Sequence, residues 1–158
     1  MNRKEAKKAA RERDFFHIFI EKKPDLRINP KSVESCCQPK PDILCFQENE
    51  RVAFELVELC DEDIARIEDI ARMKGSEFLW TSDPSENVIR EKLKKNYPTE
   101  YPVELLCYTD GRTVSWDQLI IETIRPLIDV DNGQFRRIWL LGVDECHQVW
   151  PYQKKVSP

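Results

Sequence analysis

The stretch PDILCFQENERVAFELVEL, residues 41–59, decides the fold of this chain. Its two apolar parts, residues 41–47 and 51–59, are separated by the polar residues 48–50. Two β-rich runs joined by a short polar turn predict an antiparallel β-hairpin. The second run is apolar with little alternation, which is typical of a strand whose sheet is covered on both faces.

The rest of the chain alternates between helical and strand patterns. An irregular link is expected at 24–40, which contains three prolines, and a frayed tail is expected at 153–158. The element order predicts one domain, 1–158, with the architecture of an α/β three-layer sandwich: a mixed β-sheet flanked by helices. The predicted helices are 2–23, 61–74, 84–97 and 115–128, and the predicted further strands are 78–82, 103–109, 135–142 and 146–152.

Composition favours a globular chain: Leu, Ile, Val and Phe supply 42 of the 158 residues. No apolar run reaches the roughly 18 residues of a membrane span, and charges occur throughout residues 1–20. We therefore expect a cytoplasmic protein without membrane contact. The six cysteines contain no Cys-x-x-Cys pair, which argues against structural zinc, and Cys45, Cys60 and Cys107 are expected to be reduced and apolar in character.

The charge is distributed unevenly along the chain. Residues 1–40 carry 11 basic and 6 acidic side chains, whereas residues 41–158 carry 14 and 23. A basic segment on an acidic body suits phosphate contacts, although such a run is also typical of the solvated face of a helix. The candidate nucleic-acid contacts in the first helix are Arg3, Lys4, Lys7, Lys8 and Arg11.

Acidic residues occur where a buried hairpin should exclude them. Asp42 follows Pro41 at the start of the first strand, and Glu55 and Glu58 lie inside the apolar second strand. A buried carboxylate is costly unless it is paired, hydrogen-bonded or bound to metal, and carboxylate oxygens are suitable ligands for Mg²⁺ or Mn²⁺. The alternative is an exposed strand face on which either glutamate pairs with a base such as Arg51 or Arg66.

This hairpin resembles the core of the PD-(D/E)XK nuclease superfamily. Pro41-Asp42 opens its first strand and Glu55 lies on its second, and the pair Glu55 and Glu58 also resembles the Glu-x-x-Glu strand motif of a group of small bacterial members. The resemblance implies a restriction-endonuclease-like fold and metal-dependent hydrolysis of DNA phosphodiester bonds. It further implies that Asp42 and Glu55 are the ligands of Mg²⁺ or Mn²⁺ and that Glu58 assists them.

The sequence departs from the superfamily motif at one position. The motif places a lysine two residues after the glutamate, where this chain has Val57. In some members the lysine lies on the following helix, and Lys92, beside the apolar stripe of IREKLKKNY, is then the candidate catalytic lysine. Lys92 is otherwise a surface lysine, and Glu12 in the first helix is likewise either a further site residue or, like Glu5, a surface acid.

Two functions remain open at this point. The first is a magnesium-dependent nuclease that contacts DNA through its basic first helix. The second is a catalytically inactive nuclease-fold module that binds a protein or forms a homodimer, which the acidic body and Val57 favour.

Strand geometry also predicts how the acids are oriented. A turn at 48–50 pairs Asp42 with about position 56, so Asp42 is not directly opposite Glu55 but lies near it, with carboxylate oxygens within about 6 Å. Glu55 and Glu58 are three residues apart, so on a regular strand they point to opposite faces. We expect Glu58 at the edge of the same cleft.

Overall fold

The computed structural model describes residues 2–59, 84–109, 117–143 and 145–152. One sheet contains all six described strands, in the order β1-β2-β3-β4-β5-β6. The elements are α1 (Arg3–Lys22), the 3₁₀ turns η1 (Pro24–Leu26) and η2 (Pro30–Ser32), β1 (Glu34–Ser35), β2 (Ile43–Gln47), β3 (Glu50–Glu58), α3 (Pro84–Lys94), β4 (Val103–Tyr108), α4 (Asp117–Val130), β5 (Phe135–Leu141) and β6 (Cys146–Trp150).

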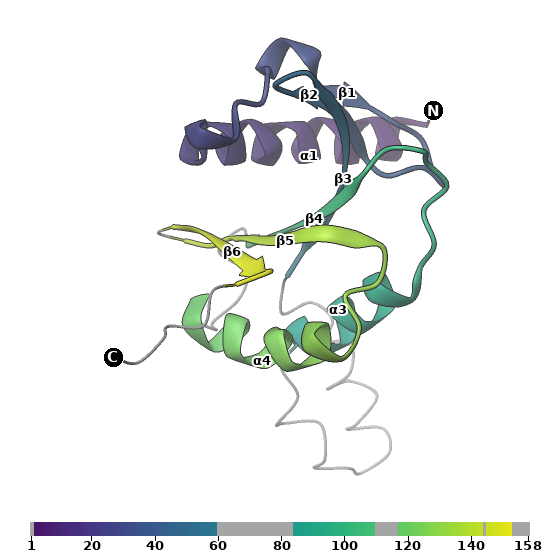
Figure 1. Ribbon diagram of the computed structural model, residues 1–158. Helices are drawn as coiled ribbons and strands as arrows, with labels where there is room; N and C mark the ends of the chain where they lie inside the picture. The colour runs from purple at the N-terminus through teal and green to yellow at the C-terminus, as the bar shows by residue number, and fades with distance from the viewer. Residues whose placement is uncertain (1, 60–83, 110–116, 144, 153–158) are drawn as a thin grey trace.

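The sheet is mixed and lies between two helical layers (Figure 1). Strands β3, β4 and β5 are parallel, whereas β2 pairs antiparallel with β3 and β6 pairs antiparallel with β5. Helix α1 covers one face, and α3 and α4 cover the other. The predicted α/β sandwich with a mixed sheet and the predicted hairpin are thus confirmed.

Each face of the sheet has its own apolar core. Toward α1, Phe16 and Phe19 pack against Phe54 of β3 and Trp139 of β5. Toward α3 and α4, Ile89 and residues such as Ile120 and Ile124 pack against alternate residues of the same strands. Because both faces are covered, β4 is buried along its whole length, which explains its continuous apolar sequence.

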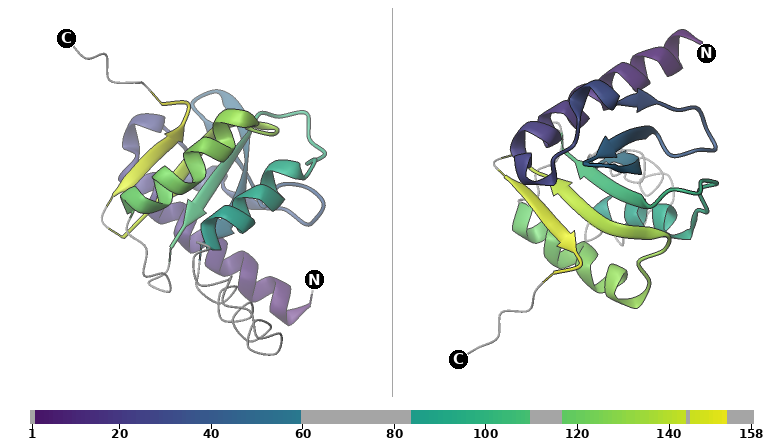
Figure 2. Two further views of the ribbon diagram at one scale, coloured as in Figure 1. Left: turned by 90° about the horizontal axis from the view of Figure 1, so that it is seen from below. Right: turned by 45° about the horizontal axis from the view of Figure 1, so that its top comes forward.

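Helix α1 is held by its apolar stripe over only part of its length. A capping box between Asn2 and Glu5 begins the helix, and Phe16 and Phe19 are fully buried near its end. Residues 3–8 are all exposed, and this part of α1 extends beyond the sheet (Figure 2). The basic N-terminal turns therefore project from the body of the molecule.

Other boundaries differ from the prediction in small ways. The link 24–40 contains η1, η2 and β1, and β1 pairs antiparallel with β2. The predicted elements 61–74 and 78–82, the tail 153–158 and Cys60 lie outside the described residues.

Cys45 and Cys107 are buried free thiols, as predicted. In the described part of the chain, no helix combines the length and the apolar character needed to cross a bilayer.

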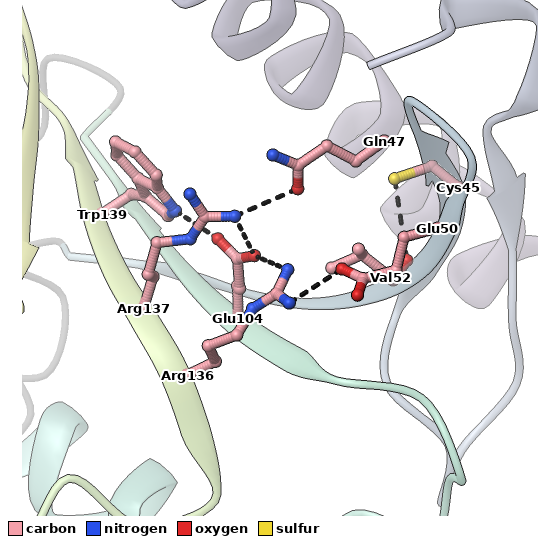
Figure 3. A network of polar contacts seen from close by, with 8 residues as sticks. All are labelled: Cys45, Gln47, Glu50, Val52, Glu104, Arg136, Arg137 and Trp139. Carbon is pink, nitrogen blue, oxygen red and sulfur yellow. Dashed lines mark hydrogen bonds and ion pairs between the residues drawn. The ribbon is translucent and has the colours of Figure 1, made fainter. Parts of the chain in front are cut away.

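Sequence reasoning did not single out Glu104, a fully buried acid in β4. Its carboxylate accepts hydrogen bonds from Arg136, Arg137 and Trp139 of β5, at 2.9, 2.9 and 2.8 Å (Figure 3). Arg136 also binds Glu50 at the start of β3, and Arg137 binds Gln47 at the end of β2. This network joins four strands at the amino ends of β3, β4 and β5.

We predict that Glu104→Ala lowers the free energy of unfolding by about 3–5 kcal/mol, because it leaves partly buried arginines without their carboxylate. Glu50→Ala is the matched control, since its ion pair with Arg136 is partly exposed and should contribute at most about 1 kcal/mol. Urea unfolding of both variants measures the difference. Equal losses would contradict the central role of Glu104.

Candidate functional site

The register of the hairpin places Asp42 across from Glu55. Ile43 pairs with Phe54 and Gln47 pairs with Glu50, so the turn has two residues rather than three. Glu48 adopts a left-handed conformation, with φ of 56°, and its N–H donates to the carbonyl of Arg27. The predicted partner of Asp42, position 56, was therefore wrong by one residue, because the turn is shorter than expected.

Asp42 is fixed where β2 separates from β3. Pairing between the two strands ends at Ile43 and Phe54, whereas β3 continues to Glu58 along β4. The N–H of Leu56 would lack a strand partner on the β2 side, and it donates instead to Asp42 Oδ2 at 2.9 Å. The carboxylate of Asp42 thus substitutes for the missing strand and stays next to β3.

Glu55 is buried, with 1% of its surface exposed, on the face of β3 that points toward α3. Lys92 of α3 donates from Nζ to Glu55 Oε2 at 2.7 Å. Val57, where the superfamily motif has lysine, lies on the same face of β3 and is packed into the α3–α4 core. A lysine at position 57 would lie on this same face of β3. Lys92 places an ammonium group on that face from helix α3.

Glu12 of α1 is the third acid of the site. It is 5% exposed, and its Oε1 lies 3.7 Å from Nζ of Lys8, one helical turn earlier. Glu12 and Asp42 line the same hollow, and the charge of Glu12 raises the pKa of Asp42. Glu12, Asp42 and Glu55 thus come together from α1, the start of β2 and the middle of β3, and we call them the carboxylate cluster. Glu5 instead forms part of the N-terminal cap of α1.

The surroundings of Asp42 and of Glu55 disfavour the ionised form of each carboxyl. Burial raises the pKa of Asp42, and the charge of Glu12 raises it further, against the opposing interactions with Glu55 and the Leu56 N–H. Burial also raises the pKa of Glu55, followed by the effect of Asp42, while Lys92 opposes the shift. Adjacent carboxylates in a buried site need a proton or a cation between them.

Two oxygens of the cluster are left without a donor. Glu12 Oε2 and Glu55 Oε1 are buried and have no hydrogen-bond partner. Within the described ranges, no three His, Cys, Asp or Glu side chains are arranged as a ready metal site. Mg²⁺, however, is commonly bound by one or two carboxylates with water and substrate phosphate as the other ligands, so the Asp42–Glu55 pair fits such an ion.

Glu58 is turned to the opposite face of β3 from Glu55. The strand pairs with β4 without a register shift, so residues three apart point to opposite sides. The carboxylate of Glu58 accepts a hydrogen bond from Arg11 Nη2 of α1. Glu58 nevertheless borders a hollow that Glu12 and Lys92 also line, so it lies at the edge of the site.

Two hollows flank Glu12. We call the first the basic hollow; its volume is about 460 Å³, and it lies at the carboxyl ends of β3 and β4. The residues that line it include Lys7, Lys8, Arg11, Glu58, Lys92 and Tyr108. The second, of about 320 Å³, is lined by residues that include Glu5, Lys8, Glu12, Cys36, Cys37 and Asp42. Glu12 thus lines both hollows, and Asp42 lines the second. The carboxyl ends of parallel strands are a common location for ligand sites.

The candidate nucleic-acid contacts separate into two groups. Arg3 and Lys4 are exposed on the projecting turns of α1 and do not line the basic hollow. Lys7, Lys8 and Arg11 do line it. Of these candidate contacts, only the second group shares the basic hollow with Glu12.

Sequence reasoning also missed Tyr97, which follows α3. Its side chain is buried, and burial, followed by the nearby Glu55 carboxylate, raises the pKa of the Tyr97 hydroxyl. Tyr97 was assigned to the apolar stripe of the helix, which ends at Lys94. Its proximity to Glu55 arises from the tertiary fold, and no pattern in the sequence indicates it.

Comparison of this chain with protein-family models, with curated proteins and with solved structures gives no significant match. The candidate site is therefore supported by its own geometry.

We predict that Asp42→Asn raises the melting temperature of the metal-free protein at neutral pH. The asparagine can still accept from Leu56 and can donate to Glu55, while one of the repelling charges is removed. A gain of about 1 kcal/mol corresponds to about 2–4 °C in a domain of this size. Differential scanning fluorimetry in a chelator measures it, with Asp25→Asn, an exposed acid, as the control.

The raised pKa values of Asp42 and Glu55 also determine how the stability of the wild-type protein depends on pH. Because the folded-state pKa values of Asp42 and Glu55 lie above their unfolded values, the folded state binds more protons over that interval. This contribution to the free energy of unfolding is present at low pH, and it is lost as the pH rises through the folded-state pKa values of Asp42 and Glu55. The gain from Asp42→Asn should therefore shrink toward pH 4, and a gain independent of pH would contradict the assignment.

Proposed function

We propose that this protein is a metal-dependent nuclease that hydrolyses DNA phosphodiester bonds. The observation that carries the proposal is the buried Asp42–Glu55 pair, with a donor-free glutamate oxygen and with Lys92 bound to the other oxygen of Glu55. This arrangement agrees with the resemblance of Pro41-Asp42 and Glu55 to the PD-(D/E)XK motif.

Asp42 and Glu55 would hold Mg²⁺ or Mn²⁺, and Glu12 would complete the acidic side of the site. A bound divalent ion activates water and neutralises charge on the scissile phosphate. Its positive charge would also oppose the effects of burial and of neighbouring acids, which raise the pKa of both carboxyls.

Lys92 has two roles in this proposal. Its ammonium fixes Glu55 through Oε2, which leaves Oε1 without a hydrogen-bond partner. It also lines the basic hollow, where a positive charge stabilises the negative charge that develops on a phosphate during hydrolysis. A phosphodiester in the basic hollow would thus contact Lys92 and Glu12, which both line it.

The alternative is a catalytically inactive module of this fold that binds a protein. It is favoured by Val57 at the motif lysine position and by the absence, in the described part of the chain, of a ready set of three metal-ligating side chains. Metal binding distinguishes the two candidates.

We predict that wild-type protein binds Mn²⁺ in isothermal titration calorimetry and that Asp42→Asn and Glu55→Gln abolish this binding. Glu48→Gln is the matched control, because Glu48 is an exposed acid at the far end of the same hairpin. Each of the two site variants should also lose Mg²⁺-dependent cleavage of DNA. Absence of binding by the wild type at millimolar metal would contradict the nuclease proposal and favour the protein-binding module.

We predict that Lys92→Met lowers kcat for DNA cleavage by about 10²–10³-fold, since it removes a charge that stabilises the transition state. Lys92→Arg should restore part of the rate, and Lys95→Met is the matched control on an exposed position just after α3. Mn²⁺ affinity should persist in Lys92→Met, because the ammonium is not a ligand. Full activity of Lys92→Met would exclude this role.

A further inference from the structure

We propose that Tyr97 is a positioning residue for Glu55 and that the turn between α4 and β5 holds Tyr97 in place. This turn comprises residues 131–134, since α4 ends at Val130 and β5 begins at Phe135. The hydroxyl of Tyr97 would orient the Glu55 carboxylate before a divalent cation binds. Its effect on metal binding rests on the proposed function, whereas its action on Glu55 does not.

Tyr97 lies on the side of the sheet that contains Glu55. Its ring belongs to the apolar core beneath α3 and α4, together with Ala53 and Val57 of β3. These two residues are two positions before and two positions after Glu55, so all three share one face of the strand. Tyr97 is 5% exposed and Glu55 is 1% exposed, so both side chains are enclosed on this side of the sheet.

The hydroxyl of Tyr97 is a polar group in an apolar core. Burial raises the pKa of Tyr97, and the neighbouring carboxylates of Glu55 and then Asp42 raise it further. The hydroxyl therefore stays protonated and can donate one hydrogen bond. Burying a hydroxyl is unfavourable without a partner, and phenylalanine would fill the same space without that cost. A hydroxyl beside two buried acids is thus suited to serve as their neutral donor.

The side chain of Gln134 fixes the main chain of Tyr97. Its Oε1 accepts from the Tyr97 N–H at 2.7 Å, and its Nε2 donates to the Tyr97 carbonyl at 2.8 Å. The ring of Phe135, the next residue, lies 5.7 Å from the ring of Tyr97 between centroids. Because α3 ends at Lys94, the helix itself does not hold Tyr97. These contacts from the turn determine where the tyrosine ring enters the core.

The turn itself packs closely against α3. Gly133 has a φ of 60°, and a Cβ at this position would lie 2.7 Å from the carbonyl oxygen of Leu93. Glycine allows both the left-handed conformation and this close approach. The turn and the end of α3 thus form one packed unit, which places Tyr97 beside Glu55.

Lys92 and Tyr97 act on Glu55 in different ways. Lys92 donates to Glu55 Oε2 at 2.7 Å and brings a positive charge, which also repels a divalent cation. Tyr97 is neutral, so it can restrict the orientation of Glu55 without opposing the cation. Removal of such a partner of a metal ligand typically weakens metal binding by about 10–100-fold.

The first test measures the interaction in a chelator, without metal or DNA. Tyr97→Phe should lower the melting temperature by about 2–4 °C, because Glu55 loses a donor. In the Glu55→Ala background, which lacks the acceptor, the same change should cause no loss. Glu55→Gln keeps a weaker, neutral acceptor, so it should reduce the loss, and it provides a folded background if the alanine does not.

Tyr152→Phe is the matched control for this test. The hydroxyl of Tyr152 donates to the exposed carboxylate of Asp129 at 3.0 Å, so it removes a similar contact outside the site. Its effect on the melting temperature should be the same in the presence and absence of the Glu55 carboxylate. Equal effects of Tyr97→Phe in the two backgrounds would overturn the positioning role.

The second test measures Mn²⁺ affinity by calorimetry. Tyr97→Phe should weaken binding at least about tenfold, and Tyr152→Phe should leave it unchanged. Mg²⁺ should also produce a tyrosine ultraviolet difference band, because a cation on Glu55 changes the electrostatic field at the neighbouring ring. This band should be absent in Tyr97→Phe at saturating Mg²⁺. A tyrosine that only fills the core would give no such band, and unchanged Mn²⁺ affinity in Tyr97→Phe would contradict the effect on metal binding.

The third test addresses the turn. Gln134→Ala removes both hydrogen bonds to the main chain of Tyr97, so it should weaken Mn²⁺ binding in the wild-type background. It should cause no further loss in the Tyr97→Phe background. Gln118→Ala is the control, since Gln118 is an exposed glutamine of α4 that binds Glu122 on the same helix. Additive losses from Gln134→Ala and Tyr97→Phe would show that Gln134 does not act through Tyr97.

The outcomes separate this inference from the proposed function. The dependence of Tyr97→Phe on Glu55 in a chelator requires neither metal nor hydrolysis. That dependence in a protein that binds no Mn²⁺ would support the positioning role and reject the nuclease. DNA cleavage with Asp42-dependent metal binding, but without coupling between Tyr97 and Glu55, would support the nuclease and reject the positioning role.

Discussion

The hydrogen bond from the Leu56 N–H to Asp42 is the contact on which the candidate site depends. It forms where β2 separates from β3, so that a side chain takes over the place of a strand. Without it, a buried N–H would lack a partner, at a cost of about 1–3 kcal/mol. The same bond holds Asp42 beside Glu55, and the resulting proximity of two buried carboxylates gives the site its electrostatic character.

Buried carboxylates at the two ends of the sheet differ in how completely they are hydrogen-bonded. At the amino ends of the parallel strands, Glu104 is satisfied by two arginines and a tryptophan, and this network joins β2 to β5. Toward the carboxyl ends, the carboxylate cluster has one ammonium in direct contact with Glu55 and retains donor-free oxygens. A fully paired acid is suited to stability, whereas an incompletely paired one is a candidate for ligand binding.

Much of the fold could be predicted because its signals are local. The helix 3–22, the hairpin and the strand after α3 follow from periodicity, turn residues and helix boundaries, which act over a few residues. The register of the hairpin was missed by one residue because it depends on the left-handed conformation of Glu48, which is supported by the distant carbonyl of Arg27. A one-residue change in a turn shifts every pairing along the strands.

The sequence by itself determined which residue types are available: an acid after Pro41, acids in an apolar strand, a basic first helix and no lysine at position 57. Only the tertiary structure decided their partners. It brought Lys92 to Glu55 across 37 residues and Arg11 to Glu58 across 47, and it separated the two glutamates onto opposite faces of β3. The physical reason is that ion pairs between elements depend on how layers pack, whereas sequence patterns report only which face of each element is apolar.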